Sequence, residues 1–215
     1  MDLNKYIEHT LLKQDATKQD LIKLFDEAKE HHFLGVCINP CYVKMAKDYL
    51  KNSNIKIITV IGFPLGANTT EVKVFETQKA ILDGADEIDM VINVTKINDC
   101  DYEYVIKEIK SIKEACAEHN LKVIIETDLL TKDEIVKACE CAISGGADFV
   151  KTSTGFVKGG VGAKAEDVEL MYNTVKNKGL KVKASGGIRN KETAISMIKA
   201  GASRLGTSSG VKIVS

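Results

Sequence analysis

The sequence predicts a (β/α)8 barrel made of a single domain that spans residues 1–215. Three observations predict this fold class. Eight β-rich apolar runs follow one another along the chain, and helical patterns separate them. Three of the helical patterns end in the same way before a strand, and no Pro-, Gly- or Ser-rich linker divides the chain. Eight strands that alternate with helices favour a closed parallel barrel over an open doubly wound sheet.

The expected strands are short apolar runs rich in β-branched residues. In chain order they are Ile7–Leu12, Phe33–Ile38, Ile55–Phe63, Glu87–Asn93, Val123–Thr127, Phe149–Thr154, Val182–Ser185 and Arg204–Ser208. The first run has an alternative interpretation, because it could equally continue an N-terminal helix.

The helices between these strands are predicted from their first residues and from apolar positions at helical spacing. Thr131 and Glu134 have capping-box spacing. The expected buried faces are Leu21, Leu24, Phe25 and Ala28 after Thr17; Val105, Ile109, Ile112 and Cys116; Ile135, Ala138, Cys139 and Ala142; and Ala194, Met197, Ile198 and Gly201 after Asn190. Glycine ends three helices in Gly84-Ala85-Asp86, Gly146-Ala147-Asp148 and Gly201-Ala202-Ser203, where it allows a left-handed cap.

Composition excludes several classes of partner. Lys+Arg and Asp+Glu both count 30, so nothing favours nucleic acid or an anionic membrane. Zero net charge is compatible with self-association, and we expect a homo-oligomer, either a dimer or a tetramer. No apolar run approaches the length of a membrane span, and the first residues lack the apolar region of a secretory signal. We therefore expect a cytoplasmic protein whose six cysteines are free thiols.

Two lysines occur in runs where a barrel should not tolerate a charge. Lys151 follows Phe149 and Val150 in the middle of an expected strand, and Lys183 lies in another. A buried ammonium is costly unless it is paired or loses its proton. Two that lie close together lower each other's pKa, and a neutral amine is a nucleophile, so the pair suggests Schiff-base chemistry. The alternative is that such a lysine lies at a solvated end of its strand. This alternative remains for Lys183, because Lys181, two residues earlier, would point to the same side of the strand and Lys183 could lie near the strand start.

Carboxylates accompany these lysines. Asp89 lies among apolar residues in the run Glu87–Asn93 and needs a partner, for which a buried lysine is the obvious candidate. An Asp–Lys pair can transfer protons, although a purely structural ion pair is about as well supported by this pattern. Glu126 and Asp128 follow another strand, and we interpret them as polar residues of the barrel mouth rather than as catalysts.

Glycine and hydroxyl residues cluster after the last three expected strands. They occur in Thr152-Ser153-Thr154-Gly155, Gly159-Gly160, Ser185-Gly186-Gly187-Ile188-Arg189-Asn190 and Gly206-Thr207-Ser208-Ser209-Gly210. These are the places where (β/α)8 enzymes commonly bind phosphate through loop amides, hydroxyls and a helix N-terminus. Each glycine pair alone is a weak signal, but together they indicate a phosphorylated substrate.

Metal and nucleotide motifs do not occur. The four histidines show no HxH or HxxxH spacing, and Cys37-x-x-x-Cys41 is not a common zinc spacing. Cys139 and Cys141 are expected to point to opposite sides of a helix. The chain also contains no Ser-His-Asp set, Walker loop or dinucleotide fingerprint. The spacings therefore predict no metal site.

At these residues the sequence resembles the deoxyribose-phosphate aldolases, a family of class I aldolases. The resemblance runs from about residue 7 to the C-terminus. The matching stretches are Ile7–Leu12, Val36–Pro40, Gly62–Gly66, Glu87–Asn93, Phe149–Gly155, Lys183–Arg189 and Gly206–Gly210.

The resemblance implies reversible cleavage of 2-deoxy-D-ribose 5-phosphate to acetaldehyde and D-glyceraldehyde 3-phosphate, without a cofactor. Lys151 would form the Schiff base, Lys183 would keep that amine unprotonated, and Asp89 would relay protons with an ordered water. Gly155, Gly186, Gly187, Ser208 and Ser209 would surround the phosphate. Glu8, where the family usually has Asp, would lie near the substrate hydroxyls, with Thr10 and Thr154 as auxiliary residues.

Two other functions remain to be weighed. One is another Schiff-base or phosphate-binding barrel that acts on a different sugar phosphate. The second is a non-catalytic sugar-phosphate binding protein. Such a binder would need the phosphate loops but not Lys151, Lys183 and Asp89 together, so their joint presence favours the enzyme.

Overall fold

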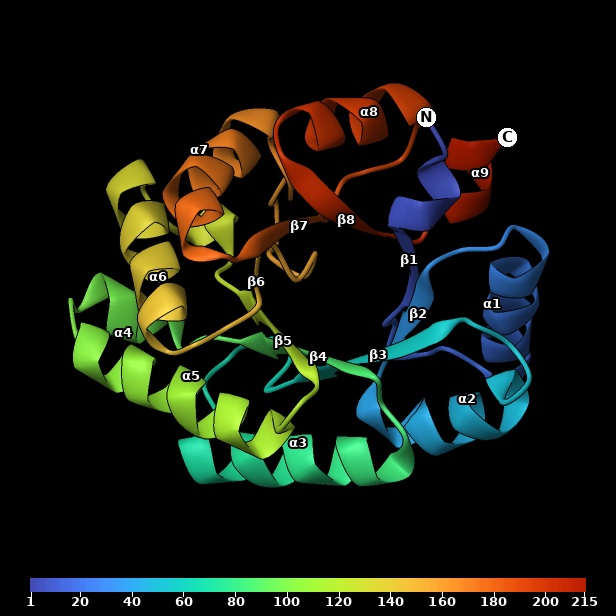
Figure 1. Cartoon of the computed structure of the whole chain (residues 1–215), viewed down its shortest axis with the longest axis horizontal. Coiled ribbons are helices and arrows are strands. Elements are labelled where there is room, and N and C mark those ends of the chain that lie inside the picture. The colour runs from blue at the N-terminus through green and yellow to red at the C-terminus, as the bar shows by residue number, and fades with distance from the viewer.

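A computed structural model of residues 1–215 is a closed barrel of eight parallel strands in the order β1 to β8 (Figure 1). The strands are β1 (Ile7–Leu11), β2 (Gly35–Ile38), β3 (Lys56–Ile61), β4 (Glu87–Val91), β5 (Asn120–Ile124), β6 (Phe149–Lys151), β7 (Lys181–Ser185) and β8 (Ala202–Thr207). Each strand pairs with the next along the chain, and β8 closes the barrel on β1. The predicted (β/α)8 fold class is confirmed.

Helices surround the barrel on all sides (Figure 1). The α-helices are α1 (Lys18–Glu30), α2 (Val43–Leu50), α3 (Thr70–Asp83), α4 (Val94–Asn98), α5 (Tyr102–Cys116), α6 (Lys132–Ser144), α7 (Ala165–Val175), α8 (Lys191–Lys199) and α9 (Gly210–Val214). Four short 3-10 helices join them: η1 (Leu3–Tyr6), η2 (Pro40–Tyr42), η3 (Thr127–Leu129) and η4 (Lys176–Lys178). The two ends of the chain meet, because α9 packs against η1 (Figure 1).

The main hydrophobic core lies between the strands and these helices. The predicted inward faces of α1, α5 and α6 are buried throughout. Ala194 and Met197 of α8 are buried as well. Burial of a large aliphatic or aromatic side chain is worth about 1.5–3 kcal/mol, so these faces hold the helices on the barrel.

Several helix ends follow the predicted chemistry. Thr17 and Thr131 both form complete capping boxes, and the Asn190 side chain accepts a hydrogen bond from the Thr193 amide. Gly201 has a φ of 112°, in the left-handed region that favours glycine, at the turn from α8 into β8.

Two predicted strand boundaries were wrong in ways that matter for the site. Strand β5 begins at Asn120 rather than at Val123, so Lys122 lies inside the barrel wall. The sequence did not indicate this start of β5, because its first residues include Asn120 and Lys122. A strand with charged side chains inside the barrel lacks the continuous apolar pattern of a parallel sheet. Strand β6 ends at Lys151 rather than at Thr154, and the next residues form a hydroxyl-rich loop. The first run is a strand, and the preceding residues form η1.

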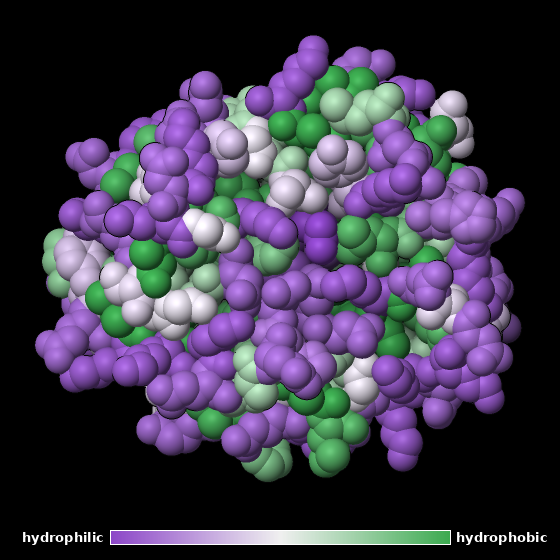
Figure 2. Space-filling view, viewed as in Figure 1, coloured by the Kyte–Doolittle hydropathy of each residue, from purple (hydrophilic) through white to green (hydrophobic).

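The inside of the barrel divides into two parts. Its apolar part is a cluster of Leu12, Cys37, Ile58 and Val60 from the side of β1, β2 and β3. The remaining interior carries charged side chains, which build the candidate site. The outer surface is mainly hydrophilic on the face that Figure 2 shows, and no helix is long and apolar enough to cross a membrane.

Candidate active site

Strand register brings Lys151 and Lys183 side by side. Lys151 of β6 pairs with Lys183 of β7, and Lys183 pairs with Arg204 of β8. Both lysines are buried, with 3% of Lys151 and 0% of Lys183 exposed. The alternative in which Lys183 lies at a solvated strand end is therefore wrong. It occupies the middle of β7, and the exposed position is that of Lys181.

Asp89 of β4 is the centre of the buried charges. Its Oδ2 lies 2.7 Å from the Nζ of Lys151 and 2.7 Å from the Nζ of Lys183. Its Oδ1 lies 3.0 Å from the Nζ of Lys122. Burial acts against ionisation of this carboxyl, but Lys122, Lys151 and Lys183 outweigh it and hold the pKa of Asp89 well below its usual value. Asp89 is therefore an acceptor for three amines.

Lys183 is held as a cation. Its Nζ forms ion pairs with Glu8 and with Asp89. Burial favours the neutral amine, but the charges of Asp89 and Glu8 outweigh it and raise the pKa of Lys183 well above its usual value. This ammonium therefore keeps its proton at neutral pH.

Glu8 does not lie where the resemblance placed it. Its side chain is fully buried beneath the cavity and contacts Lys183, with Oε1 3.4 Å from the Nε of Arg204 and 3.7 Å from the Nζ of Lys122. Glu8 is the second residue of β1, so its side chain lies deep in the barrel rather than at the mouth. Thr10, two residues further along, reaches the mouth instead.

Two further buried charges were missed. Lys122 is fully buried on β5, and its Nζ lies 2.6 Å from Oε2 of Glu87 on β4. Asp89 and Glu8 outweigh burial and raise the pKa of Lys122. Burial opposes ionisation of Glu87, but Lys122 and Lys56 lower its pKa to about 2. Both residues are ionised at neutral pH. The available signal was the alternation Glu87-Ile88-Asp89, which puts two carboxylates on the same side of one strand.

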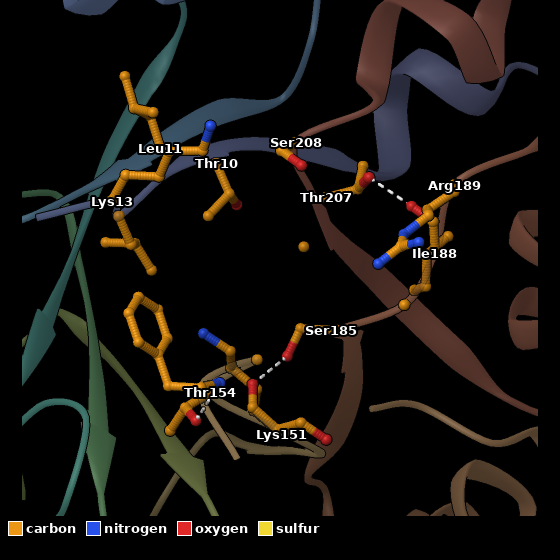
Figure 3. Close-up of a pocket in the computed structure, with 17 residues that line it drawn as sticks. Thr10, Leu11, Lys13, Lys151, Thr154, Ser185, Ile188, Arg189, Thr207 and Ser208 are labelled. Atoms are coloured by element: carbon orange, nitrogen blue, oxygen red, sulfur yellow. Dashed lines mark hydrogen bonds between the residues drawn. The ribbon is translucent and has the colours of Figure 1, made fainter. Parts of the chain in front are cut away.

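A cavity of about 300 Å³ opens above these charges at the carboxyl ends of the strands (Figure 3). Its lining residues are Thr10, Leu11, Leu12, Lys13, Lys151, Ser153, Thr154, Gly155, Phe156, Ser185, Gly186, Gly187, Ile188, Arg189, Gly206, Thr207 and Ser208. Lys151 is the only member of the buried charged group that lines it. Figure 3 shows Lys151 and Thr154 on one side, with Thr10 and Ser208 opposite. Among the buried amines, Lys151 is thus the one that a bound molecule can reach.

The predicted phosphate loops form one end of this cavity. Gly155, Gly186, Gly187 and Ser208 all line it, whereas Ser209 does not, because Ser209 turns into α9 and donates its amide to Thr207 Oγ1 at 2.9 Å. Thr207 Oγ1 in turn donates to the Ile188 carbonyl at 2.7 Å (Figure 3). This bond joins the loops after β7 and β8.

Two cations at the mouth were not singled out in the sequence. Lys13 follows β1 and Arg189 follows the Gly186-Gly187 turn, and both line the cavity from exposed positions. Arg189 lies beside Ile188 at the same end as Thr207 (Figure 3). Cations and free loop amides together favour an anionic group there.

Close backbone contacts require glycine in these loops. Gly187 has a φ of 73°, and a Cβ on it would lie 2.3 Å from the Val161 carbonyl oxygen. Gly162 has a φ of 77°, and its Cβ would lie 2.4 Å from the Gly186 carbonyl carbon. The loop after β6 therefore packs directly on the turn after β7, and side chains would separate them.

The Glu126 carboxylate holds Thr154 in place by hydrogen bonds. The Thr154 amide lies 3.2 Å from both carboxylate oxygens of Glu126, and its hydroxyl donates to the same carboxylate. Burial raises the pKa of Glu126. Asp128 accepts from the Gly162 amide at 2.7 Å. Both acids thus support loops of the barrel mouth. No group of three or more His, Cys, Asp or Glu side chains is placed to hold a metal ion.

Comparison with protein families finds a match to the family described as DeoC/LacD family aldolase over residues 3–215. Among curated proteins, the deoxyribose-phosphate aldolase of Mycoplasma capricolum is 56% identical over 212 residues, which cover 99% of this chain and 94% of that protein. That of Thermococcus gammatolerans is 56% identical over 218 residues, covering 100% of this chain and 96% of the other.

Solved structures show the same likeness. One of a putative deoxyribose-phosphate aldolase from Coccidioides immitis superposes with a TM-score of 0.97 at 43% identity, over 99% of this chain and 84% of that one. The tetrameric deoxyribose phosphate aldolase of Aeropyrum pernix superposes with a TM-score of 0.91 at 34% identity, over 99% and 89% of the two chains.

Proposed function

The chain belongs to the DeoC/LacD family of aldolases, and we propose that it reversibly cleaves 2-deoxy-D-ribose 5-phosphate to acetaldehyde and D-glyceraldehyde 3-phosphate. The enzyme is a carbon–carbon lyase that works through a lysine Schiff base. The residue that forms it is Lys151, because its amine lines the cavity while Lys122 and Lys183 lie beneath.

Cleavage begins with the neutral amine of Lys151. It attacks the C1 aldehyde of the open-chain sugar to give a carbinolamine, whose hydroxyl takes up a proton and leaves as water, so that a protonated imine remains. The C2–C3 bond then breaks. Its electron pair moves toward the imine nitrogen to give an enamine, and the C3 hydroxyl loses its proton as C3 becomes the aldehyde of glyceraldehyde 3-phosphate.

Release of the second product needs a proton and a water. The enamine takes a proton at C2, which regenerates an imine, now of acetaldehyde. Water adds to this imine, and acetaldehyde leaves as Lys151 recovers its amine. Asp89 is within 2.7 Å of both Lys151 and Lys183, so it can pass protons between the reacting amine and the fixed ammonium with the help of a water in the cavity.

One experiment separates this enzyme from a sugar-phosphate binder. Borohydride added in the presence of substrate should reduce the imine and leave a stable adduct that whole-protein mass spectrometry detects. A non-catalytic binding protein would bind the sugar phosphate at the phosphate loops but would form no adduct. Absence of an adduct under conditions where substrate is consumed would refute the Schiff-base route.

The phosphate end of the cavity gives a second prediction. Ser208→Glu introduces a negative charge among the loops that should hold a dianion, so turnover of the phosphorylated sugar should fall by roughly tenfold or more, corresponding to about 1.4 kcal/mol. Turnover of unphosphorylated deoxyribose should change much less. The matched control is Ser196→Glu on the exposed face of α8, which adds the same charge away from the cavity. Equal losses on both substrates would place the phosphate elsewhere.

We also propose that the protein self-associates. The Aeropyrum pernix relative is tetrameric, and this chain carries no net charge that would oppose association. Sedimentation equilibrium should therefore find a species heavier than the 23.5 kDa protomer. A single protomer mass at high concentration would contradict it.

A further inference from the structure

We propose that Lys122 and Glu87 are positioning residues that set the charge beneath Lys151 and thereby the pH range over which Lys151 acts as a nucleophile. The inference rests on the proposed function. Neither residue lines the cavity, so neither touches the substrate, and both act on Lys151 through Asp89.

An unbroken chain of charged contacts runs from the cavity to the opposite end of the barrel. Lys151 Nζ lies 2.7 Å from Asp89, and Asp89 lies 3.0 Å from Lys122 Nζ. Lys122 Nζ lies 2.6 Å from Glu87, and Glu87 lies 2.6 Å from Lys56 Nζ. The Lys56 side chain is 43% exposed and is solvated at that end. The inner four members of this chain are buried, so their charges act on one another with little screening.

Charged groups of both signs contact one another below the cavity. The carboxylates of Glu8, Glu87 and Asp89 and the amines of Lys122 and Lys183 are buried there. Arg204 and Lys56 contact the same group from partly exposed positions. Because the buried charges are poorly screened, removing the charge of Lys122 or of Glu87 changes the free energy of placing a charge on Lys151.

Lys183 is not the only charge that acts on Lys151. Asp89 Oδ2 lies 2.7 Å from the Nζ of Lys151 and 2.7 Å from that of Lys183, so the carboxylate attracts a proton to Lys151 and offsets the repulsion from the ammonium. Lys122 occupies the other oxygen of Asp89 and removes part of that attraction. Glu87 pairs with Lys122 as well and therefore weakens the influence of the Lys122 charge on Asp89 and Lys151.

Every strand contributes to the field at Lys151. The charged and titratable groups that face the barrel interior are Glu8 on β1, Cys37 on β2, Lys56 on β3, Glu87 and Asp89 on β4, Lys122 on β5, Lys183 on β7 and Arg204 on β8, with Glu126 after β5. Burial raises the pKa of the Cys37 thiol, which therefore adds no charge at neutral pH. Glu126 faces Thr154 rather than the amines. The carboxylates and ammonium groups beneath Lys151 therefore dominate.

The test uses charge changes of opposite sign. Lys122→Met removes a cation, so the limb on which the rate of imine formation rises with pH should move to higher pH by roughly one unit. Glu87→Gln removes an anion, so the same limb should move to lower pH. The double variant Lys122→Met/Glu87→Gln restores the balance and should return the limb close to its wild-type position.

The readout is the pH dependence of borohydride trapping of the wild-type and variant full-length enzymes, together with kcat and KM. Lys110→Met, which removes an exposed cation on α5, is the matched control and should leave the limb in place. If Lys122→Met does not fold, Glu87→Gln and the charge-balanced double variant still carry the test. Shifts of opposite sign that cancel in the double variant support the proposal. Rates that are scaled down with no movement of the limb would overturn it. Absence of wild-type trapping would instead refute the proposed function.

Discussion

Lys151→Ala is expected to abolish the trapped adduct and to lower turnover by about 10⁴-fold or more, the scale on which loss of a covalent nucleophile acts. The amine of Lys151 is the one member of the buried charged group that lines the cavity, so neither Lys122 nor Lys183 can replace it. The truncation should be tolerated by the fold, because it leaves Asp89 with two ammonium partners, Lys122 and Lys183.

The matched control for this prediction is Lys181→Ala. Lys181 lies on the neighbouring strand β7 but is exposed, so its loss should leave both trapping and turnover close to wild type. Retention of a borohydride adduct by Lys151→Ala would contradict the assignment, because it would require a second lysine to reach the substrate.

Lys183→Met is expected to have the next largest effect, a loss of roughly 10²- to 10⁴-fold in kcat at neutral pH. The variant removes the ammonium beside Lys151. The Asp89 carboxylate then stabilises a proton on the Lys151 amine without competition from Lys183. Deprotonation of Lys151 should then need a higher pH, so the variant should regain relative activity as pH rises. The pH–rate profiles of variant and wild type measure this directly.

Stability needs a control in this experiment. Lys183→Met removes the buried ammonium that contacts both Glu8 and Asp89, and breaking such a pair typically costs about 3–5 kcal/mol. Adding Glu8→Gln removes the carboxylate charge that Lys183 neutralised and should recover part of the free energy of unfolding. If the profile of a folded Lys183 variant keeps its wild-type shape and is only scaled down, Lys183 donates protons or positions groups directly, and the charge argument fails.

Sequence periodicity was enough to predict the fold because the determinants of the elements are local. The buried positions of α1, α5 and α6 follow helical spacing, and Thr17 and Thr131 cap their helices as their spacing predicted. Apolar strands with glycine at the preceding helix end repeat along the chain, and that repetition distinguishes a barrel from an open sheet. The same local signals located Lys151 and Asp89 within strands.

The remaining charges could not be placed from the sequence, because their partners come from distant strands. Lys122 pairs with Glu87, 35 positions away, and the polar start of β5 concealed that strand's inner end. The Lys73 and Glu108 side chains form another fully buried ion pair at 2.8 Å, between α3 and α5. Charged residues are normally expected to be exposed, so a buried ion pair can be recognised only when the structure shows that its two residues lie together.

Glu8 illustrates the same limit. The resemblance directed attention to the substrate hydroxyls, whereas the strand geometry directs this carboxylate to Lys183 and Arg204. Whether a residue of a barrel strand reaches the mouth or the floor depends on its height along the barrel. That height is set by the register between strands, which sequence periodicity does not determine.

The most direct test of the account is to map the reduced adduct to a residue. Wild-type enzyme treated with borohydride during turnover should yield, after proteolysis and mass spectrometry, one modified peptide that carries N-ethyl-lysine at Lys151, the reduction product of the acetaldehyde imine. The same modification at Lys183 or Lys122 would contradict the central claim that the cavity-lining amine is the nucleophile and the buried amines are its charged neighbours.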